Sequence, residues 1–153
     1  MILLELTAAE TELLRTLVTQ YEELVQAPAG DDPALERLFP AAYRDDPDAA
    51  AEFSRYTRRG LIEHKSANAG VIAAAVTAQD GAVALSDDDA ARWLPVLTDL
   101  RLVLAERLGI RTDDDPVPAE PLGEVYNWLG GLQQHLVDAL DALADRDADG
   151  ATP

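Results

Sequence analysis

Four of the chain's 12 Lys and Arg residues lie close together in the sequence, at Arg55, Arg58, Arg59 and Lys65. Guanidinium and ammonium groups bind carboxylates and phosphates. The group therefore predicts a patch that binds an acidic segment of a protein partner, or a phosphate. The alternative is that these side chains pair internally with the many Asp and Glu residues, and the sequence leaves both interpretations open.

Arg101 is a second candidate, because it falls within an apolar stripe. Its neighbours at helical spacing are Leu94, Leu97, Leu104 and Leu108. Part of the Arg101 side chain should therefore be buried, and a buried guanidinium requires a carboxylate or several other acceptors. Asn68 lies on another inward stripe and is expected to join Arg101 in a structural polar cluster between helices. A ligand-binding role for Arg101 is the alternative.

Residues for catalysis, metal binding or cofactor binding form no recognisable pattern. Cysteine is absent, which excludes disulfides, thiolate nucleophiles and redox sensing by thiols. His135 and Asp138 lie one helical turn apart, but no second such pair completes a metal site, so His135 is interpreted as a surface residue. The sequence has no glycine-rich phosphate loop and no Gly-x-Ser-x-Gly elbow. We therefore expect a non-enzymatic protein without metal or cofactor.

Acidic residues dominate the charge: 29 Asp and Glu residues against 12 Lys and Arg residues give a net charge of −17. Such a charge repels nucleic acids and anionic membranes, so direct binding to either is not expected. The sequence also has no secretory signal and no apolar run long enough to span a bilayer. These features predict a cytoplasmic protein.

Helices must position the candidate residues, because apolar residues recur at spacings of three and four. The predicted helices cover about residues 7–26, 32–38, 48–57, 58–77, 86–108 and 122–144. A capping box formed by Thr7 and Glu10 begins the first helix. Thr57 can either continue the preceding helix or cap a new one. We favour a break there because the following residues have their own inward stripe, formed by Leu61, Lys65, Asn68, Ile72 and Ala75.

The predicted fold is all-α: a single compact bundle of about five to six helices over residues 1–144, followed by a disordered acidic tail at residues 145–153. Trp93 and Trp128 are expected to anchor a core of Leu, Val and Ala. Residues 2–6 and 82–85 each precede a capped helix, and they either pair as a small two-stranded ribbon or remain separate. Gly130 and Gly131 fall within a helix and predict either close approach of a neighbouring helix or a hinge.

Three ordered motifs carry a resemblance to a known family. They read Asp32-Pro33-x-Leu35-x-x-Leu38-x-Pro40-x-x-Tyr43-Arg44, then Thr98-Asp99-Leu100-Arg101-Leu102, then Val125-Tyr126-x-Trp128-Leu129-x-x-Leu132-Gln133. Over essentially its whole length the chain resembles an actinobacterial domain-of-unknown-function family that includes the oxidative-stress regulator AosR. The resemblance implies a small, cytoplasmic, non-enzymatic helical protein that regulates transcription under oxidative stress through a sigma factor. It brings no catalytic residues, and cysteine-based sensing cannot be carried over to this chain.

Three hypotheses for function follow. The first is a regulatory or adaptor protein that acts through protein–protein contacts, with a sigma factor or another transcription component as partner. The second is a direct DNA-binding transcription regulator, which the net charge opposes. The third is a small-molecule-binding bundle, which requires a concave pocket with convergent polar groups near Arg101 and Asn68. Association into a homo-oligomer is compatible with all three.

Overall fold

The computed structural model describes residues 1–39, 47–78 and 81–150, without the side chains of residues 47–56 and 78. These residues form two strands and five helices: β1 (Ile2–Glu5), α1 (Ala8–Val25), α2 (Ala34–Leu38), α3 (Pro47–Ala78), β2 (Ala82–Leu85), α4 (Asp87–Leu108) and α5 (Pro121–Gly150). The prediction of an all-α fold is confirmed.

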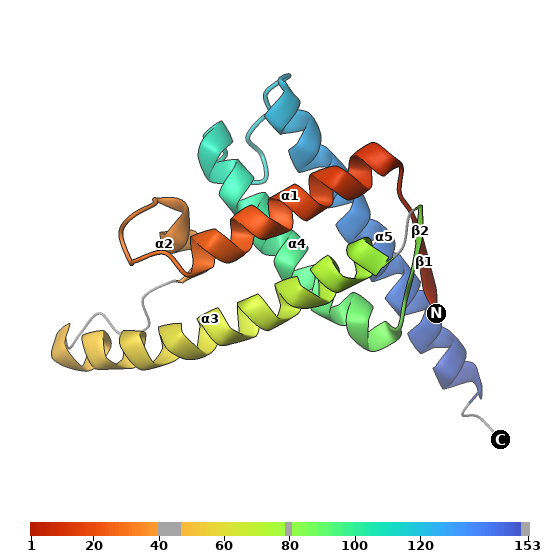
Figure 1. Ribbon diagram of the computed structural model, residues 1–153, viewed down its shortest axis with the longest axis horizontal. Helices are drawn as coiled ribbons and strands as arrows, with labels where there is room; N and C mark the ends of the chain where they lie inside the picture. Colours follow the sequence, from red (N-terminus) through yellow and green to blue (C-terminus); the bar gives the residue numbers. More distant parts are fainter. Residues whose placement is uncertain (40–46, 79–80, 151–153) are drawn as a thin grey trace.

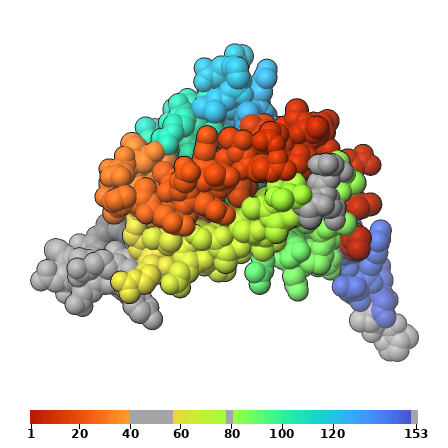
Figure 2. All heavy atoms as spheres, in the orientation of Figure 1, coloured from red at the N-terminus to blue at the C-terminus, as the bar shows by residue number. Residues whose placement is uncertain are grey.

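Helix α4 lies at the centre of the described structure (Figure 1). It contacts α5, α3 and α2, while α1 packs mainly against α3. Figure 2 shows α1 and α3 side by side along one face of the molecule. The core forms where these helices converge, and its largest fully buried side chains include Leu14, Ile72, Trp93, Leu97, Leu129 and Leu136.

The two tryptophans occupy different depths in this core. Trp93 is fully buried, and its indole Nε1 has no hydrogen-bond partner in the described structure. Trp128 is half-buried and packs against the buried cluster from α5. A buried indole N–H without an acceptor is unfavourable, so the apolar contacts of Trp93 must outweigh that cost.

The helix ends follow local sequence signals. Thr7 and Glu10 form the predicted capping box, in which the Thr7 N–H donates to Glu10 Oε1 at 2.9 Å and the Glu10 N–H donates to Thr7 Oγ1 at 3.1 Å. The pKa of Glu10 is lowered, chiefly by the hydrogen bond from the Thr7 backbone. Ser86 caps α4, and Gly109 ends it with a φ of 74°, a left-handed conformation that favours glycine.

The two strands pair, which confirms the ribbon alternative. β1 and β2 are antiparallel, with Ile2 opposite Leu85 and Glu5 opposite Ala82. Ile2 and Leu4 are buried, whereas Leu3, on the other face of the strand, is 60% exposed. Within the described residues the sheet has no further strand. The ribbon therefore adds its buried face to the helical core.

Two predicted helix boundaries were wrong. α3 continues through Thr57 without the expected break, and it spans Pro47–Ala78. Neither proline nor glycine occurs at residues 55–59, and threonine disfavours a helix interior only weakly, so packing along α3 overrides that preference. α5 continues past Ala144 to Gly150, and residues 144–150 are exposed. The predicted tail is thus helical through Gly150, and residues 151–153 lie outside the described part.

Candidate functional site

The motif segments of α4 and α5 contact each other through polar side chains. Thr98 Oγ1 accepts a hydrogen bond from Gln133 Nε2, and Gln133 Oε1 accepts one from Arg101 Nη1 at 3.5 Å. The Arg101 guanidinium lies 4.3 Å from the centroid of the Tyr126 ring, a favourable cation–π contact. A Cβ added at Gly130 would lie 3.3 Å from Arg101 Cζ and Nε. Gly130 therefore gives room to an arginine side chain rather than to a neighbouring helix.

Arg101 is weakly partnered for a largely enclosed cation. Its Nε is buried and has no hydrogen-bond partner. None of the ion pairs among the described residues includes Arg101. Asn68 is buried on α3, but the contacts described for Arg101 are with α5 and do not include Asn68.

Asp99, also in α4, organises a buried polar group that we call the Asp99 triad. Tyr21 Oη and Lys65 Nζ each donate to Asp99 Oδ2 at 2.6 Å. The side chains of Lys65 and Asp99 are only 15% and 10% exposed. Burial and the contact with Asp99 raise the pKa of Tyr21. The triad therefore ties α1 and α3 to the central helix α4.

The four basic residues predicted as a patch have different environments. Lys65 belongs to the Asp99 triad. Arg58 Nη2 donates to a backbone carbonyl beyond the end of α1 at 3.3 Å, and the Arg58 guanidinium lies 4.2 Å from the centroid of the Phe39 ring. Arg59 is exposed, and the side chain of Arg55 lies outside the described residues. Two of the four predicted residues thus have internal partners.

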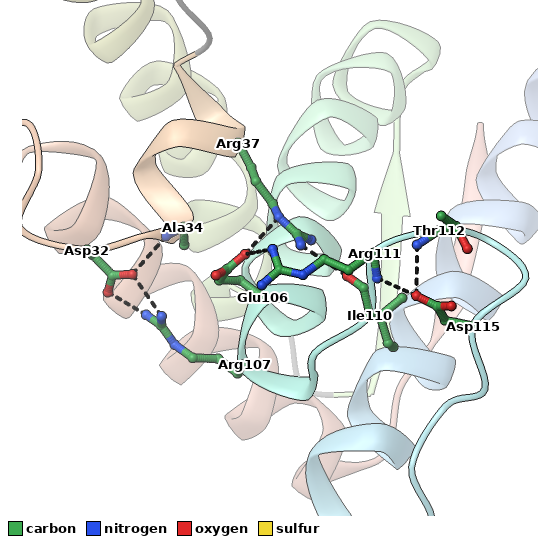
Figure 3. Close-up of polar contacts among 9 residues, drawn as sticks. All are labelled: Asp32, Ala34, Arg37, Glu106, Arg107, Ile110, Arg111, Thr112 and Asp115. Atoms are coloured by element: carbon green, nitrogen blue, oxygen red, sulfur yellow. Dashed lines mark hydrogen bonds and ion pairs between the residues drawn. The ribbon is translucent and has the colours of Figure 1, made fainter.

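Ion pairs fasten α2 and the segment after α4 to the end of α4 (Figure 3). Arg37 Nε lies 2.9 Å from Glu106 Oε2, and Arg111 Nη1 lies 3.3 Å from the same oxygen. Arg37 Nη2 also donates to the Ile110 carbonyl at 3.0 Å. Arg111 remains 68% exposed, whereas the side chain of Glu106 is 15% exposed. The Glu106 carboxylate therefore forms ion pairs with both Arg37 and Arg111.

A second pair in Figure 3 joins the start of α2 to α4. Arg107 Nη1 donates to Asp32 Oδ1 at 2.8 Å, and Nη2 donates to the other carboxylate oxygen. Asp32 Oδ1 also accepts from the Ala34 N–H at 2.9 Å. The Arg107 guanidinium is the largest cause of the lowered pKa of Asp32, and the same contact raises the pKa of Arg107. Asp115 likewise accepts backbone N–H groups, from Arg111 and the next residue, which lowers the pKa of Asp115.

A polar pocket opens beside Arg101, between α4, α5 and the segment after α4. We call it the arginine pocket, and its volume is about 180 Å³. Three guanidinium side chains line it, together with hydroxyl and amide groups and one carboxylate: Arg37, Arg101, Arg111, Thr98, Thr112, Gln133 and Asp113. The pocket contains the convergent polar groups that the sequence hypothesis required, but Asn68 is not part of its lining.

A larger groove of about 490 Å³ lies where α1, α4 and the start of α5 approach one another. We call it the apolar groove, because most of its lining is apolar: Leu17, Leu24, Leu100, Val103, Leu104 and Leu122. Gln20, Glu23 and Arg107 supply polar atoms. Arg107 is already paired with Asp32, so Glu23 gives this groove a negative edge.

The histidines and carboxylates do not assemble a metal site in the described structure. No group of three or more potential ligands occurs among the described residues. His135 is exposed, and its Nε2 lies 3.4 Å from the Leu3 carbonyl oxygen. Among the helices described, none combines the length and the apolar character needed to cross a bilayer.

A family model described as a domain of unknown function, DUF2017, matches residues 1–140. The chain belongs to this family. The resemblance carried by the ordered motifs is therefore confirmed, and two of those motifs form the α4–α5 contact around Arg101.

Several relatives of this DUF2017 chain carry the name oxidative stress regulator AosR. The proteins from Mycobacterium tuberculosis and Mycobacterium bovis are each 35% identical over 124 residues, covering 69% of this chain and 57% of theirs. An AosR protein of Mycobacterium leprae is 32% identical over 130 residues, covering 73% of this chain and 60% of its own length. The match thus spans less than two thirds of these relatives. No solved structure matches the chain.

Sequence reasoning identified Arg101 in this DUF2017 chain but not its companions in the arginine pocket. Arg37 lies 64 residues before Arg101 and Arg111 lies ten residues after it, each on a different segment. Their spacing contains no signal, because tertiary contacts alone bring them together. The available signal was the position of Arg101 within an apolar stripe, which correctly indicated a charged side chain that enters the protein.

Proposed function

We propose that this DUF2017 protein is a non-enzymatic regulator that acts by binding a protein partner in the apolar groove. The groove is the observation on which the proposal depends, because four half-buried apolar side chains line it above the buried Leu100 and Leu104: Leu17, Leu24, Val103 and Leu122. Relatives that carry the name oxidative stress regulator support a regulatory role.

The shape and lining of the apolar groove favour an amphipathic helix as the bound segment. Such a helix buries apolar side chains at positions i, i+3 or i+4, and i+7 in an apolar groove. Leu17 and Leu24 on α1, with Val103 on α4, would contact those side chains.

Charge favours a partner helix that carries Lys or Arg beside its apolar face. Glu23 lies at the groove, Arg107 is neutralised by Asp32, and the whole chain has a net charge of −17. Complementary charge speeds encounter and disfavours acidic partners. A sigma factor or another transcription component is the partner class that we propose.

Site-specific photocrosslinking in the native host tests this proposal. A photoreactive amino acid replaces Gln20, which lines the groove and is exposed. The crosslinked partner peptide should be an amphipathic helical segment with basic residues. In the same background Val103→Lys should reduce the crosslink about tenfold or more, because a cation replaces an apolar contact and repels the basic partner.

Leu3→Lys is the matched control, because it places the same cation at an exposed apolar residue of β1. It should leave the crosslink unchanged. Crosslinks confined to a second copy of the chain, or an equal effect of Leu3→Lys and Val103→Lys, would refute the proposal. Circular dichroism of both variants confirms that they remain folded.

A further inference from the structure

We propose that the arginine pocket binds a small phosphate-class oxyanion, either inorganic phosphate or a simple phosphate monoester. This inference goes beyond the proposed partner binding and concerns a different surface. The apolar groove is formed by α1, α4 and the start of α5, and the two sites share none of their lining residues. Failure of either proposal therefore leaves the other intact.

Arg101 is the centre of the proposed site because it is held in place but incompletely bonded. The Tyr126 ring and Gly130 on α5 fix the position of the guanidinium. Its Nε is buried without a partner, and its described hydrogen bond to Gln133 is 3.5 Å long. Since no described ion pair includes Arg101, its Nη groups are the donors left for an anion in the pocket beside them.

The surrounding groups add donors from several directions. Arg37 and Arg111 share the single carboxylate of Glu106. The Thr98 hydroxyl accepts from Gln133, which leaves its own hydrogen available to donate. Three guanidinium groups and hydroxyl groups fit a tetrahedral oxyanion, whereas a planar carboxylate is satisfied by one guanidinium fork.

The local charge also favours an anion. The lining contains three arginines and one acid, Asp113. Glu106 pairs with Arg37 and Arg111 from outside the lining. Asp115 also attracts Arg111 while it accepts the backbone N–H groups of residues 111 and 112, so the positive excess is confined to the lining itself. The lining is thus cationic in a chain with a net charge of −17.

The volume limits the size of the ligand. At about 180 Å³, the pocket is smaller than the 300–1,000 Å³ that drug-sized ligands and cofactors occupy. A phosphate group with a short substituent fits this space. Such an anion would give a cysteine-free regulator a chemical input that requires no thiol.

Nuclear magnetic resonance titration of the whole chain tests the site directly. The probes are inorganic phosphate and methyl phosphate, with acetate as the planar monoanion, at about pH 8, where the phosphates are mostly dianionic. Ionic strength is held constant because screening alters weak anion binding. The Arg101 Nε–H resonance should shift and saturate with inorganic phosphate or methyl phosphate, and it should respond much less to acetate.

Three variants distinguish a defined site from general electrostatics. Arg111→Gln removes an exposed guanidinium of the pocket and should weaken binding about tenfold or more. Asp113→Asn removes the repelling carboxylate and should strengthen binding about threefold. Arg59→Gln removes the same charge as Arg111→Gln from an exposed position on α3 and should leave affinity within about twofold.

The proposal would be overturned if the pocket bound no phosphate, or if binding showed no selectivity for phosphate or for the pocket. Binding that fails to saturate, or saturation without a shift of the Arg101 Nε–H, excludes the site. Equal affinity for acetate excludes a phosphate-class ligand, and equal weakening by Arg59→Gln and Arg111→Gln shows only long-range attraction. If inorganic phosphate saturates and methyl phosphate does not, the site binds the free ion; saturation by methyl phosphate shows that it accepts monoesters.

Discussion

At the residue scale, Asp99 and Arg101 of one short motif in α4 contact other helices on opposite sides of α4. Asp99 and Arg101 are two positions apart, which places their side chains about 200° apart around the helix axis. Asp99 contacts α1 and α3 through Tyr21 and Lys65, whereas Arg101 contacts α5. The central helix thus holds three other helices through polar groups as well as through its apolar stripe.

Removing Asp99 should strongly destabilise the protein. In Asp99→Ala, the buried Lys65 ammonium and the Tyr21 hydroxyl lose their common acceptor. We expect the free energy of unfolding, measured with urea, to fall by about 3 kcal/mol. Asp141→Ala, at an exposed position on α5, should change it by less than about 0.5 kcal/mol. A loss below about 1 kcal/mol in Asp99→Ala would show that the triad contributes little.

Gly130 and Gly131 form a matched pair for testing the packing of Arg101. Alanine at Gly131 meets open space, so Gly131→Ala should raise the free energy of unfolding by about 0.5–1 kcal/mol through helix propensity. Alanine at Gly130 would press on Arg101 at 3.3 Å, so this gain should be absent. In an Arg101→Ala background Gly130→Ala should regain it. Equal gains from both single variants would contradict the close contact.

At the scale of elements, the sequence predicted what local signals encode. The capping box of Thr7 and Glu10 and the helical stripes each depend on residues close in sequence, and each is confirmed. The uninterrupted α3 was not predicted, because a cap-like Thr57 looks the same whether or not the helix continues through it.

Partners distant in sequence could not be predicted for the candidate site. Lys65 lay both in the predicted basic patch and on an inward stripe, and the structure places it inward against Asp99. The stripe gave its direction, but no local pattern identified the carboxylate 34 residues away. The same holds for Arg37, whose partner Glu106 lies on another helix.

The Asp32–Arg107 pair should make the attachment of α2 to α4 dependent on pH. The pKa of Asp32 is lowered in the folded protein, so its contribution is present above the unfolded pKa of about 3.9 and is lost as the pH falls through the folded value. The side chains of Arg107 and Asp32 are 40% and 23% exposed, which limits the contribution of the pair to about 1 kcal/mol or less.

Urea unfolding of wild type and Asp32→Asn between about pH 6 and pH 3 tests this dependence. The wild type should be the more stable near pH 6, and the difference should shrink towards pH 3 as Asp32 is protonated. Asp31→Asn is the control, because the neighbouring Asp31 side chain has no partner among the described contacts. A difference that grows on acidification would contradict the assigned ion pair.

At the scale of the whole molecule, the net charge and the packed core have opposite effects on the stability of the folded chain. The net charge of −17 repels itself, while the apolar core and the internal ion pairs oppose that repulsion. The exposed end of α5 adds further acidic residues outside the packed body (Figure 1).

Added salt should therefore stabilise the folded chain. Raising NaCl from about 0.01 M to about 0.3 M shortens the screening length from about 30 Å to below 10 Å and weakens the repulsion between surface carboxylates. We expect Tm, measured by circular dichroism, to rise by several degrees at pH 7. A variant with four exposed acids of residues 138–149 changed to Asn should show a smaller rise. A fall in Tm with salt would show that attractive ion pairs dominate.

The pairing of β1 with β2 sets an order of events during translation. β1 is synthesised well before β2, α4 and α5. The apolar side chains of Ile2 and Leu4 therefore remain exposed until these later elements have been made. The earliest residues of the ribbon are thus among the last to be buried, and a nascent chain stalled before residue 82 would offer them to a chaperone.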